Sequence, residues 1–514
     1  MKVDISRRFF IGGAVSFGAF AGCRFFESHD FRAGGSPNLK FGVVSDIHIM
    51  RVGADEKMTE WGNNQVFRHT LEWFRDQGVD AVMIAGDMAD NGMDDHLMAV
   101  AEAWYAVFPN DRYPDGRPVE KVFVYGNHDY HGYLYGDYAA KHYPDPAECR
   151  KHVLRANLKG WWEKIFNEEY SRFYVKDIKG YRFLGAHWDD GKGMETCYGG
   201  ATFGAELSAY LAAHGRDVDP SLPFFYVQHP HPKDTCYGPW AWGHDGGRVT
   251  ECLSAFPNAI AFSGHSHYSL TDERSIWQGA FTSVGTGSLR YTGLPYNERY
   301  PVGYENTTTE GKDAWRHNAV KLMGKISDGD CRQGMLWSVY DDCIVVKRRQ
   351  FVPDLDLADD WVLPLPAVEP KPFAFAARAK RFAAPLFAVD AKLEVKHVKA
   401  KMRGGKSPDG KTVIPAAEKD ALQVIVPAAV VDRNARLYEL EITAEARNGV
   451  RKTKVLMAEG FNHGPEHPRT GAFSFCNFAL DELPKGEVRF IVTPMNCFHR
   501  RGTPLVSEWC DCQT

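Results

Sequence analysis

Residues 39–48 read LKFGVVSDIH, a short apolar run that ends directly in Asp46 and His48. Four later apolar runs also end in Asp, His or Asn. Their polar clusters are Gly86-Asp87-Met88-Ala89-Asp90, Gly126-Asn127-His128-Asp129, Gln228-His229-Pro230 and Gly264-His265-Ser266-His267. Carboxylate and amide oxygens, combined with neutral imidazole nitrogens, suit Zn, Mn or Fe. The five clusters therefore offer enough ligands for two metal ions, with one carboxylate bridging them.

The five runs are short, mostly apolar and bounded by turn residues, which is typical of buried strands. They cover residues 41–45, 81–85, 122–125, 224–227 and 259–262. In an open α/β sheet the ligand crevice lies beyond the carboxyl ends of the strands, where all five clusters fall. A single Gly-Asp or Gly-His pair after an apolar run is more often plain turn chemistry. Five clusters in one ordered set favour a metal site instead.

This ordered set resembles the signature of the calcineurin-like metallophosphoesterases: D-x-H, G-D-x-x-D, G-N-H-[DE], a lone His, and G-H-x-H. The resemblance covers residues 39–352 and implies an α/β fold, a four-layer α/β/β/α sandwich. By position it implies one metal ion held by Asp46, His48, Asp87 and His267, and a second held by Asp87, Asn127, His229 and His265. The implied cofactors are two divalent or trivalent ions of Mn, Fe or Zn.

The same resemblance gives His128 and Asp129 catalytic roles rather than ligand roles. His128 is expected to point at the phosphate, with Asp129 and Asp46 orienting its ring. A hydroxide bridging the two metals would attack phosphorus in line, and His128 would assist the departing alkoxide. We expect Asp90 to hydrogen-bond a metal-ligand loop without touching metal.

The N-terminus carries a second signal. Lys2, Arg7 and Arg8 precede an apolar stretch over residues 11–21, which predicts a signal peptide over residues 1–23, too short to span a membrane. Residues 6–10, SRRFF, resemble a twin-arginine export motif, and residues 20–23, FAGC, resemble a lipoprotein cleavage box. Cys23 would then be acylated and anchor the chain to the outer or inner membrane, facing the periplasm or the cell surface. The alternative is an ordinary cleavage site with an incidental thiol.

Composition adds little to these signals. The chain has 514 residues, is 44% hydrophobic and carries a net charge of -5, as expected of a soluble globular protein without a nucleic-acid footprint. Removing Cys23 from the 11 cysteines leaves ten, compatible with disulfides or with buried thiols.

The length and the patterning predict several domains. Residues 24–38 form a tether and residues 39–352 the metallophosphoesterase domain, which a hairpin of residues 335–340 and 344–347 closes. Residues 353–385, rich in Pro and Ala, form a linker. Short alternating strands over residues 386–514 predict an accessory all-β sandwich.

Substrate contacts are expected in the segments between the motifs. Trp240 and Trp242 follow His229 in an aromatic loop, and residues 130–162 supply further rings for an opposing wall. These rings would stack on the substrate, or they pack the loop onto the core. Arg290 would reach the phosphate, or it forms a surface salt bridge.

We therefore expect an extracytoplasmic, dinuclear-metal phosphoesterase that favours phosphodiesters because aromatic residues flank its site. The alternatives are a phosphomonoesterase and a non-catalytic, surface-anchored binding protein. Motif spacing does not separate the esterase classes. The oligomeric state stays open.

Overall fold

The computed structural model describes residues 35–50, 63–189, 201–214, 219–237, 246–292, 331–367, 371–402, 405–406, 413–414, 417–430, 437–458, 461–463, 474–498 and 500–512. The predicted signal peptide with Cys23, and the predicted substrate residues Trp240 and Trp242, lie outside these ranges.

The first large sheet is built around three parallel strands, β1 (Leu39–Val44), β2 (Ala81–Ala85) and β3 (Glu120–Val124). The predicted hairpin is confirmed: β10 (Gln333–Val339) and β11 (Cys343–Phe351) pair antiparallel, and β10 also pairs antiparallel with β1. The strand order is β12 (Asp354–Asp356), β11, β10, β1, β2 and β3, and β13 (Trp361–Pro364) also pairs with β11.

The second large sheet has the order β4-β5-β6-β7-β9-β8. Its strands are β4 (Phe173–Ile178), β5 (Tyr181–Ala186), β6 (Phe224–Val227), β7 (Ala259–Ser263), β9 (Thr282–Gly285) and β8 (Ile276–Gln278). From β5 to β9 the neighbours run parallel, because helices and long segments connect them.

The two sheets pack face to face through large apolar side chains. The ring of Phe41 on β1 lies 5.3 Å from Phe183, 4.9 Å from Phe225 and 6.0 Å from Phe262 of the second sheet. All four rings are buried, and burying a phenylalanine stabilises a fold by roughly 1.5–3 kcal/mol. This shared core brings the carboxyl ends of both sets of parallel strands to one edge.

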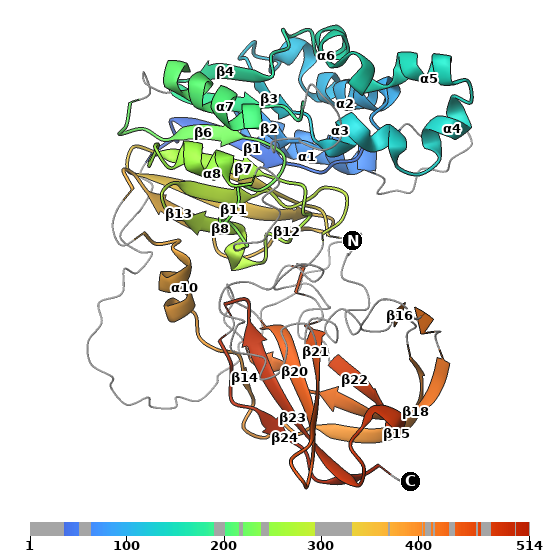
Figure 1. Ribbon diagram of the computed structural model, residues 1–514. Coiled ribbons are helices and arrows are strands. Elements are labelled where there is room, and N and C mark those ends of the chain that lie inside the picture. The colour runs from blue at the N-terminus through green and yellow to red at the C-terminus, as the bar shows by residue number, and fades with distance from the viewer. Residues whose placement is uncertain are drawn as a thin grey trace, which may run out of the picture.

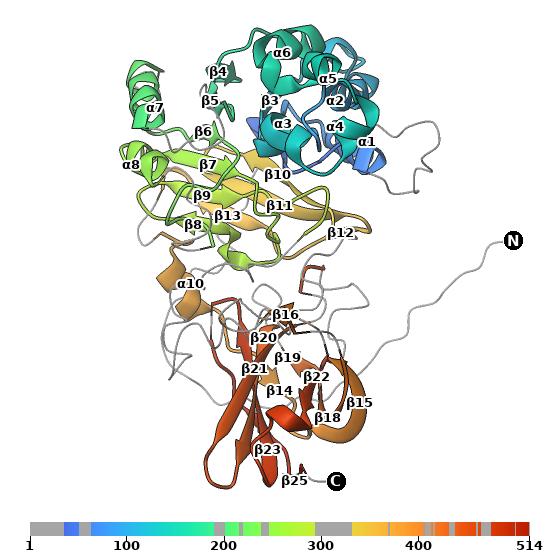
Figure 2. The ribbon, with the colours of Figure 1, turned by 45° about the vertical axis from the view of Figure 1, so that its right-hand side comes forward.

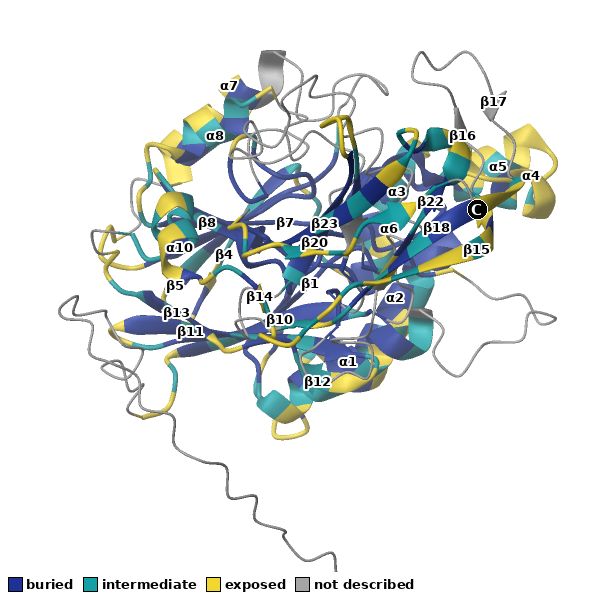
Figure 3. Ribbon diagram, turned by 90° about the horizontal axis from the view of Figure 1, so that it is seen from below, coloured by how far each residue is buried: buried dark blue, intermediate teal, exposed yellow. Residues whose placement is uncertain are grey.

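Helices cover the two outer faces, which completes the four-layer sandwich (Figure 1). The helices on the first sheet are α1 (Asn63–Gln77), α2 (Asp94–Val107) and α6 (Leu158–Phe166), and those on the second are α7 (Ala201–His214) and α8 (Arg248–Leu253). On α1, Phe67, Leu71 and Phe74 lie at helical spacing and form one buried stripe. Figure 3 shows the strands largely buried and the outer helix faces exposed. The predicted fold class is therefore confirmed.

Short elements complete this part of the chain. They are η1 (Pro109–Asp111), α3 (Asn127–His131), η2 (Gly132–Leu134), α4 (Tyr138–His142), α5 (Pro146–His152), η3 (Leu154–Ala156) and η4 (Glu273–Ser275).

The strands after residue 385 form separate sheets, drawn in orange and red below the large sheets in Figures 1 and 2. One sheet contains β15 (Glu394–Met402), β18 (Ala417–Val426) and β22 (Ser474–Ala479). The other contains β21 (Arg451–Met457), β20 (Leu437–Ala446), β23 (Glu487–Asn496), β24 (Leu505–Val506) and β25 (Cys510–Asp511). Two short pairs join β14 (Leu386–Phe387) to β19 (Ala429–Val430), and β16 (Gly405–Lys406) to β17 (Val413–Ile414). Leu422, Phe478, Ile442 and Phe490 share one core between the two larger sheets, which makes a sandwich.

The segment 353–385, which the sequence predicts as a linker, contains regular structure. Strands β12 (Asp354–Asp356) and β13 (Trp361–Pro364) pair with β11 and so belong to the first sheet. Helix α10 (Phe375–Arg381) follows and lies between the large sheets and the C-terminal sandwich in Figure 2. We refer to that sandwich as the C-terminal domain.

Two further observations bear on the sequence predictions. The nine cysteines within the described ranges are free thiols, so the disulfide interpretation gains no support from them. Among the described helices, none combines the length and the apolar character that crossing a membrane requires.

Candidate metal centre

The five polar clusters meet at one edge of the sandwich. Asp46, Asp87 and Asn127 directly follow or lie near the ends of β1, β2 and β3, while His229 follows β6 and His265 follows β7. Parallel strands place their carboxyl ends at the same edge of a sheet. Face-to-face packing of the two sheets then brings the ligands of both together.

The first ligand group consists of Asp46, His48, Asp87 and His267, all buried, with one ligand atom from each lying within 4.8 Å of the others. His267 Nε2 lies 3.2 Å from Asp46 Oδ1 and 3.1 Å from His48 Nε2. This is the set that the family resemblance implies for one ion.

The second group contains Asp87, His229 and His265. His229 Nε2 lies 3.1 Å from Asp87 Oδ2, 3.0 Å from Asn127 Oδ1 and 3.2 Å from His265 Nδ1. All seven sequence-predicted ligands are thus brought together. Asp87 belongs to both groups, as a bridging carboxylate must.

Hydrogen bonds fix the tautomers of three ligand imidazoles. Nδ1 of His229 donates to the Ala85 carbonyl at 2.7 Å, and Nδ1 of His48 donates to Asp90 Oδ1 at 3.0 Å. His267 Nδ1 lies 3.2 Å from the Tyr291 carbonyl. Each Nδ1 is therefore occupied, and each Nε2 can face a metal ion. The donor set and its tautomers fit two transition-metal ions.

The electrostatics favour the metal-binding protonation states of Asp87 and His48, and the opposite state of His229. Burial alone would raise the pKa of the Asp87 carboxyl, but the charges of His229 and His128 hold it well below its usual range. Burial lowers the pKa of His48 to about 4, so this ring is neutral. Burial would also lower the pKa of His229, but Asp87 raises it to about 9, so a metal ion must displace that proton.

Two glycines of the motifs lie so close to ligand carboxylates that a larger residue would clash with them. A Cβ on Gly126 would lie 2.3 Å from Asp87 Oδ1, and one on Gly264 would lie 2.5 Å from Asp46 Oδ2. Several ligands also adopt the left-handed conformation that most side chains avoid. These are Asp46 (φ 50), His48 (φ 50), Asp87 (φ 53), His265 (φ 71) and His267 (φ 55).

His128 lies beside Asp87, which both ligand groups share. Its predicted orienting partners, Asp129 and Asp46, form hydrogen bonds with other groups. Its Nδ1 donates to the Asp90 carbonyl at 2.7 Å, and its backbone N–H donates to Asp87 Oδ1 at 2.7 Å. The Asp46 carboxylate instead accepts from the backbone N–H of His265 at 3.0 Å. Asp90 is therefore the residue that orients His128.

Asp129, expected to help orient His128, braces the backbone. Its carboxylate accepts the backbone N–H groups of Ala89 at 2.7 Å, Gly126 at 2.7 Å and Met88 at 3.2 Å. Burial and the neighbouring charge of Asp87 raise the pKa of Asp129 to about 7. Asp129 thus ties the second cluster to the third, as a positioning residue.

Asp90 also connects the site to Arg290. The carboxylate that accepts from His48 forms an ion pair with Arg290 Nη1. The Arg290 side chain is 30% exposed, so it stands at the rim of the site in a salt bridge, with its backbone N–H bonded to the Asp46 carbonyl. The salt-bridge interpretation of Arg290 is thus confirmed, and its contact with the phosphate stays a prediction.

Three aromatic rings lie near imidazoles of the site: two near metal-ligand rings and one near His128. Tyr135, from the predicted opposing wall, is 4.8 Å from the His128 ring. Tyr291 is 4.3 Å from His267, and Trp188 is 5.8 Å from His265. Tyr291 and Trp188 escaped the sequence reasoning, because neither belongs to a motif. Adjacency to Arg290 is the one signal that points to Tyr291.

The amino-acid sequence matches a known protein-family model. A family model described as calcineurin-like phosphoesterase matches residues 39–269, a segment that contains all five clusters. No curated protein sequence matches this chain.

Solved structures resemble the chain only distantly. A dimetal phosphatase from Danio rerio is 14% identical in sequence, with a TM-score of 0.35. The alignment covers 62% of this chain and 99% of the phosphatase chain. A purple acid phosphatase from yellow lupin (Lupinus luteus) seeds has 12% identity, covers 64% of this chain and 55% of its own, and has a TM-score of 0.39. A phosphopantetheinyl hydrolase from Mycobacterium tuberculosis has 12% identity, with coverage of 49% and 91% and a TM-score of 0.29.

The family assignment therefore rests on the matched segment and on the ligands within it. Because that segment supplies every ligand of both metal groups, residues 39–269 belong to the calcineurin-like phosphoesterases, and the protein is a metal-dependent hydrolase.

Proposed function

We propose that this protein hydrolyses a phosphodiester, with His128 as the proton donor to the leaving group. The observation that carries the proposal is the pair of ligand groups sharing Asp87, with His128 beside them. Two cations bound there would activate a water nucleophile and neutralise charge on the phosphoryl oxygens. The protein itself must position His128 and accommodate the ester groups.

The hydrogen bonds of His128 suit a general acid. Its Nδ1 is held by the Asp90 carbonyl, which leaves Nε2 as the nitrogen that can transfer a proton. Its ring lies 4.3 Å from the ring of His48, and its side chain is 24% exposed. A leaving-group oxygen could therefore approach it from solvent.

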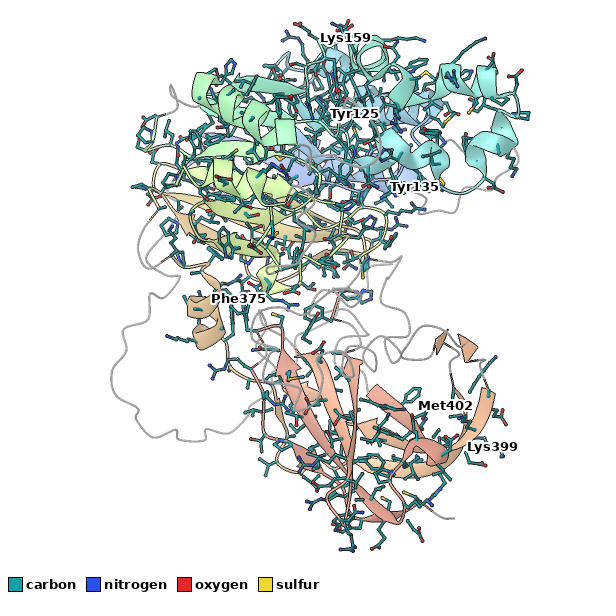
Figure 4. The ribbon with its side chains drawn as sticks, in the orientation of Figure 1. Tyr125, Tyr135, Lys159, Phe375, Lys399 and Met402 are labelled. Carbon is teal, nitrogen blue, oxygen red and sulfur yellow. The ribbon has the colours of Figure 1, made fainter. Side chains whose placement is uncertain are left out.

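The aromatic residues Tyr135 and Tyr291 beside the site favour a phosphodiester substrate over a phosphomonoester. Tyr135, labelled in Figure 4, is 38% exposed, and its ring lies 4.8 Å from that of His128. Tyr291 lies against His267 of the first ligand group. Such rings can stack on planar groups. A substrate with organic groups on two sides of phosphorus would use both, whereas a monoester has one organic group.

The direct test is an assay of the purified chain loaded with Mn. We expect turnover of a bis-aryl phosphodiester above that of an aryl phosphomonoester, and loss of turnover in Asp87→Asn, which removes the bridging charge. Asp219→Asn, at an exposed position before β6, is the matched control and should keep full activity.

The other outcomes separate the alternatives. Faster monoester turnover would make the protein a phosphomonoesterase. Two bound metals without turnover of either ester would favour a non-catalytic binding protein, and unchanged activity in Asp87→Asn would sink the site assignment.

We also propose that the protein acts outside the cytoplasm, exported by its twin-arginine-like motif and anchored through acylated Cys23. The support is the sequence of residues 1–23 alone. The double variant Arg7→Lys, Arg8→Lys should stay in the cytoplasm, and Cys23→Ala should leave the membrane fraction. Unchanged fractionation of both variants would reject this proposal.

A further inference from the structure

The C-terminal domain contacts the back of the loop that carries the last metal ligand. This loop, residues 267–271, begins at His267 and ends at Thr271. The Thr271 hydroxyl donates to the carbonyl of Phe461 at 2.7 Å, and Phe461 lies after β21 in the C-terminal domain. Thr271 is 2% exposed and Phe461 3%, so this contact is closed to solvent.

Gln333, the first residue of β10, joins the same two parts of the chain. Its side-chain Nε2 donates to the carbonyl of Asn462 at 2.7 Å. Its side-chain Oε1 accepts from the backbone N–H of Leu270 at 2.8 Å, within the His267 loop. Gln333 is fully buried, so both ends of its amide are committed to these contacts.

Gln333 also holds a second loop that contacts His267. Its backbone N–H donates to the carbonyl of Ser288 at 2.8 Å. The Ser288 hydroxyl lies 3.2 Å from His267 Nδ1 and donates to the carbonyl of Asp46 at 3.2 Å. His267 and Asp46 both belong to the first ligand group. Gln333 thus links two metal ligands to the C-terminal domain: its side chain bridges the His267 loop and Asn462, and its backbone N–H holds the Ser288 loop.

A buried charge cluster holds the two parts together beside this contact. Glu273 accepts from Arg348 Nη1 at 2.5 Å and also pairs with Arg378 of α10, so α10 is tied to the large sheets. The guanidinium of Arg274 lies 4.7 Å from the ring of Tyr438 in the C-terminal domain. Figure 4 shows Phe375 of α10 between the two parts, and this ring packs with Phe498 at 5.5 Å.

We infer that the C-terminal domain is a working part of the metal centre: its 461–463 loop, through Gln333 and Thr271, positions His267 for the ion held by Asp46, His48, Asp87 and His267. The inference rests on the metal site of the proposed function and assigns a role to Gln333 as a positioning residue. His267 holds a positive φ of 55°, a conformation that persists only where the surroundings enforce it. By linkage, metal bound at that group must in turn stabilise the docking of the 461–463 loop.

The test compares Gln333→Met with Gln350→Met in the full-length chain. Gln350 is the register partner of Gln333 on β11, is also fully buried, and donates to the carbonyl of Val352 at 2.8 Å. Gln333→Met should weaken binding of one of the two metal ions at least tenfold and change the absorption spectrum of cobalt in that group. Gln350→Met should leave both affinities and the spectrum as in the wild type.

A second pair of variants tests the hydrogen bond from the Thr271 hydroxyl to the Phe461 carbonyl. Thr271→Val removes the donor to Phe461, whereas Thr443→Val removes a hydroxyl bond to Thr453 of 2.8 Å within the C-terminal domain. Thr271→Val should again weaken one ion selectively, and Thr443→Val should not. In the wild type, added metal should slow backbone hydrogen exchange in residues 461–463, and this response should shrink in Gln333→Met.

The measured metal affinities distinguish a failure of this inference from a failure of the proposed function. A wild-type chain that binds no metal overturns the proposed function and this inference with it. Two ions bound by the wild type and bound equally well by Gln333→Met and Thr271→Val overturn the inference alone, as does an equal loss of affinity in the Gln350→Met control.

Discussion

At the residue scale, His128 contacts Asp87 through its backbone, while its ring lies outside the two groups that share Asp87 and instead groups with His48 and Asp90. We expect His128→Ala to keep both metal ions and to lower kcat about 10²–10⁴-fold, the usual contribution of a general acid. The loss should be larger for an alkyl than for a nitrophenyl leaving group, because a good leaving group needs no proton. Metal counts and turnover of the two esters check this, and loss of metal would make His128 a ligand.

Asp90 is a second test at this scale, because its carboxylate holds the tautomer of His48 while its carbonyl holds His128. Asp90→Ala removes only the carboxylate. Metal affinity should fall about 10–100-fold, the typical cost of losing a partner of a ligand imidazole. Titration against a metal buffer measures it, with Arg290→Met as the control that removes the other partner of this carboxylate. Equal metal affinity in Asp90→Ala and the wild type would contradict this role.

At the scale of single elements, strand β20 contains a fully buried carboxyl group, that of Glu439, whose oxygens accept no hydrogen bond from the described residues. Burial raises its pKa to about 8, although the charge of Arg274 opposes the shift. The unfolded chain ionises near the ordinary value of about 4.5, so the folded state loses stability as pH rises from there to about 8.

Glu439→Gln should therefore stabilise the protein, and the gain should grow between pH 5 and pH 8 and then level off. A shift of this size corresponds to a few kcal/mol, at about 1.4 kcal/mol per pKa unit. Thermal unfolding of wild type and variant across this pH range measures the effect, and Glu418→Gln, at an exposed position of β18, is the control. A gain that does not vary with pH would refute the assignment.

The elements themselves were largely predictable. All five short strands that end in ligand clusters, and β10, are present within one or two residues of their predicted ends, because apolar runs bounded by turn residues specify buried strands locally. The second hairpin strand, β11, extends four residues beyond its predicted end. The pairing of β12 and β13 with β11 was not predictable, since a Pro- and Ala-rich segment has no pattern that distinguishes an edge strand from a linker.

At the scale of the whole molecule, metal binding should stabilise the fold, because the ligands come from both large sheets. A ligand that binds only the folded state adds about 2.7 kcal/mol per site at one hundred times its Kd. Chelation should lower the Tm of the wild type and leave that of Asp87→Asn nearly unchanged. Calorimetry with and without chelator measures both, and an equal Tm for metal-free and metal-loaded wild type would argue against a shared site.

The sequence by itself indicated the candidate metal ligands, the strands that present them and the family resemblance. Each cluster lies directly after its own strand, so this information is local, and the order of the clusters makes it specific. The tertiary structure alone decided that the carbonyl of Asp90, and neither Asp129 nor Asp46, orients His128. It alone decided that Gln333 joins the His267 loop to the C-terminal domain, over separations of 63 and 129 residues. Such contacts depend on how two sheets and a second domain pack together, and no local pattern of polar and apolar residues encodes that.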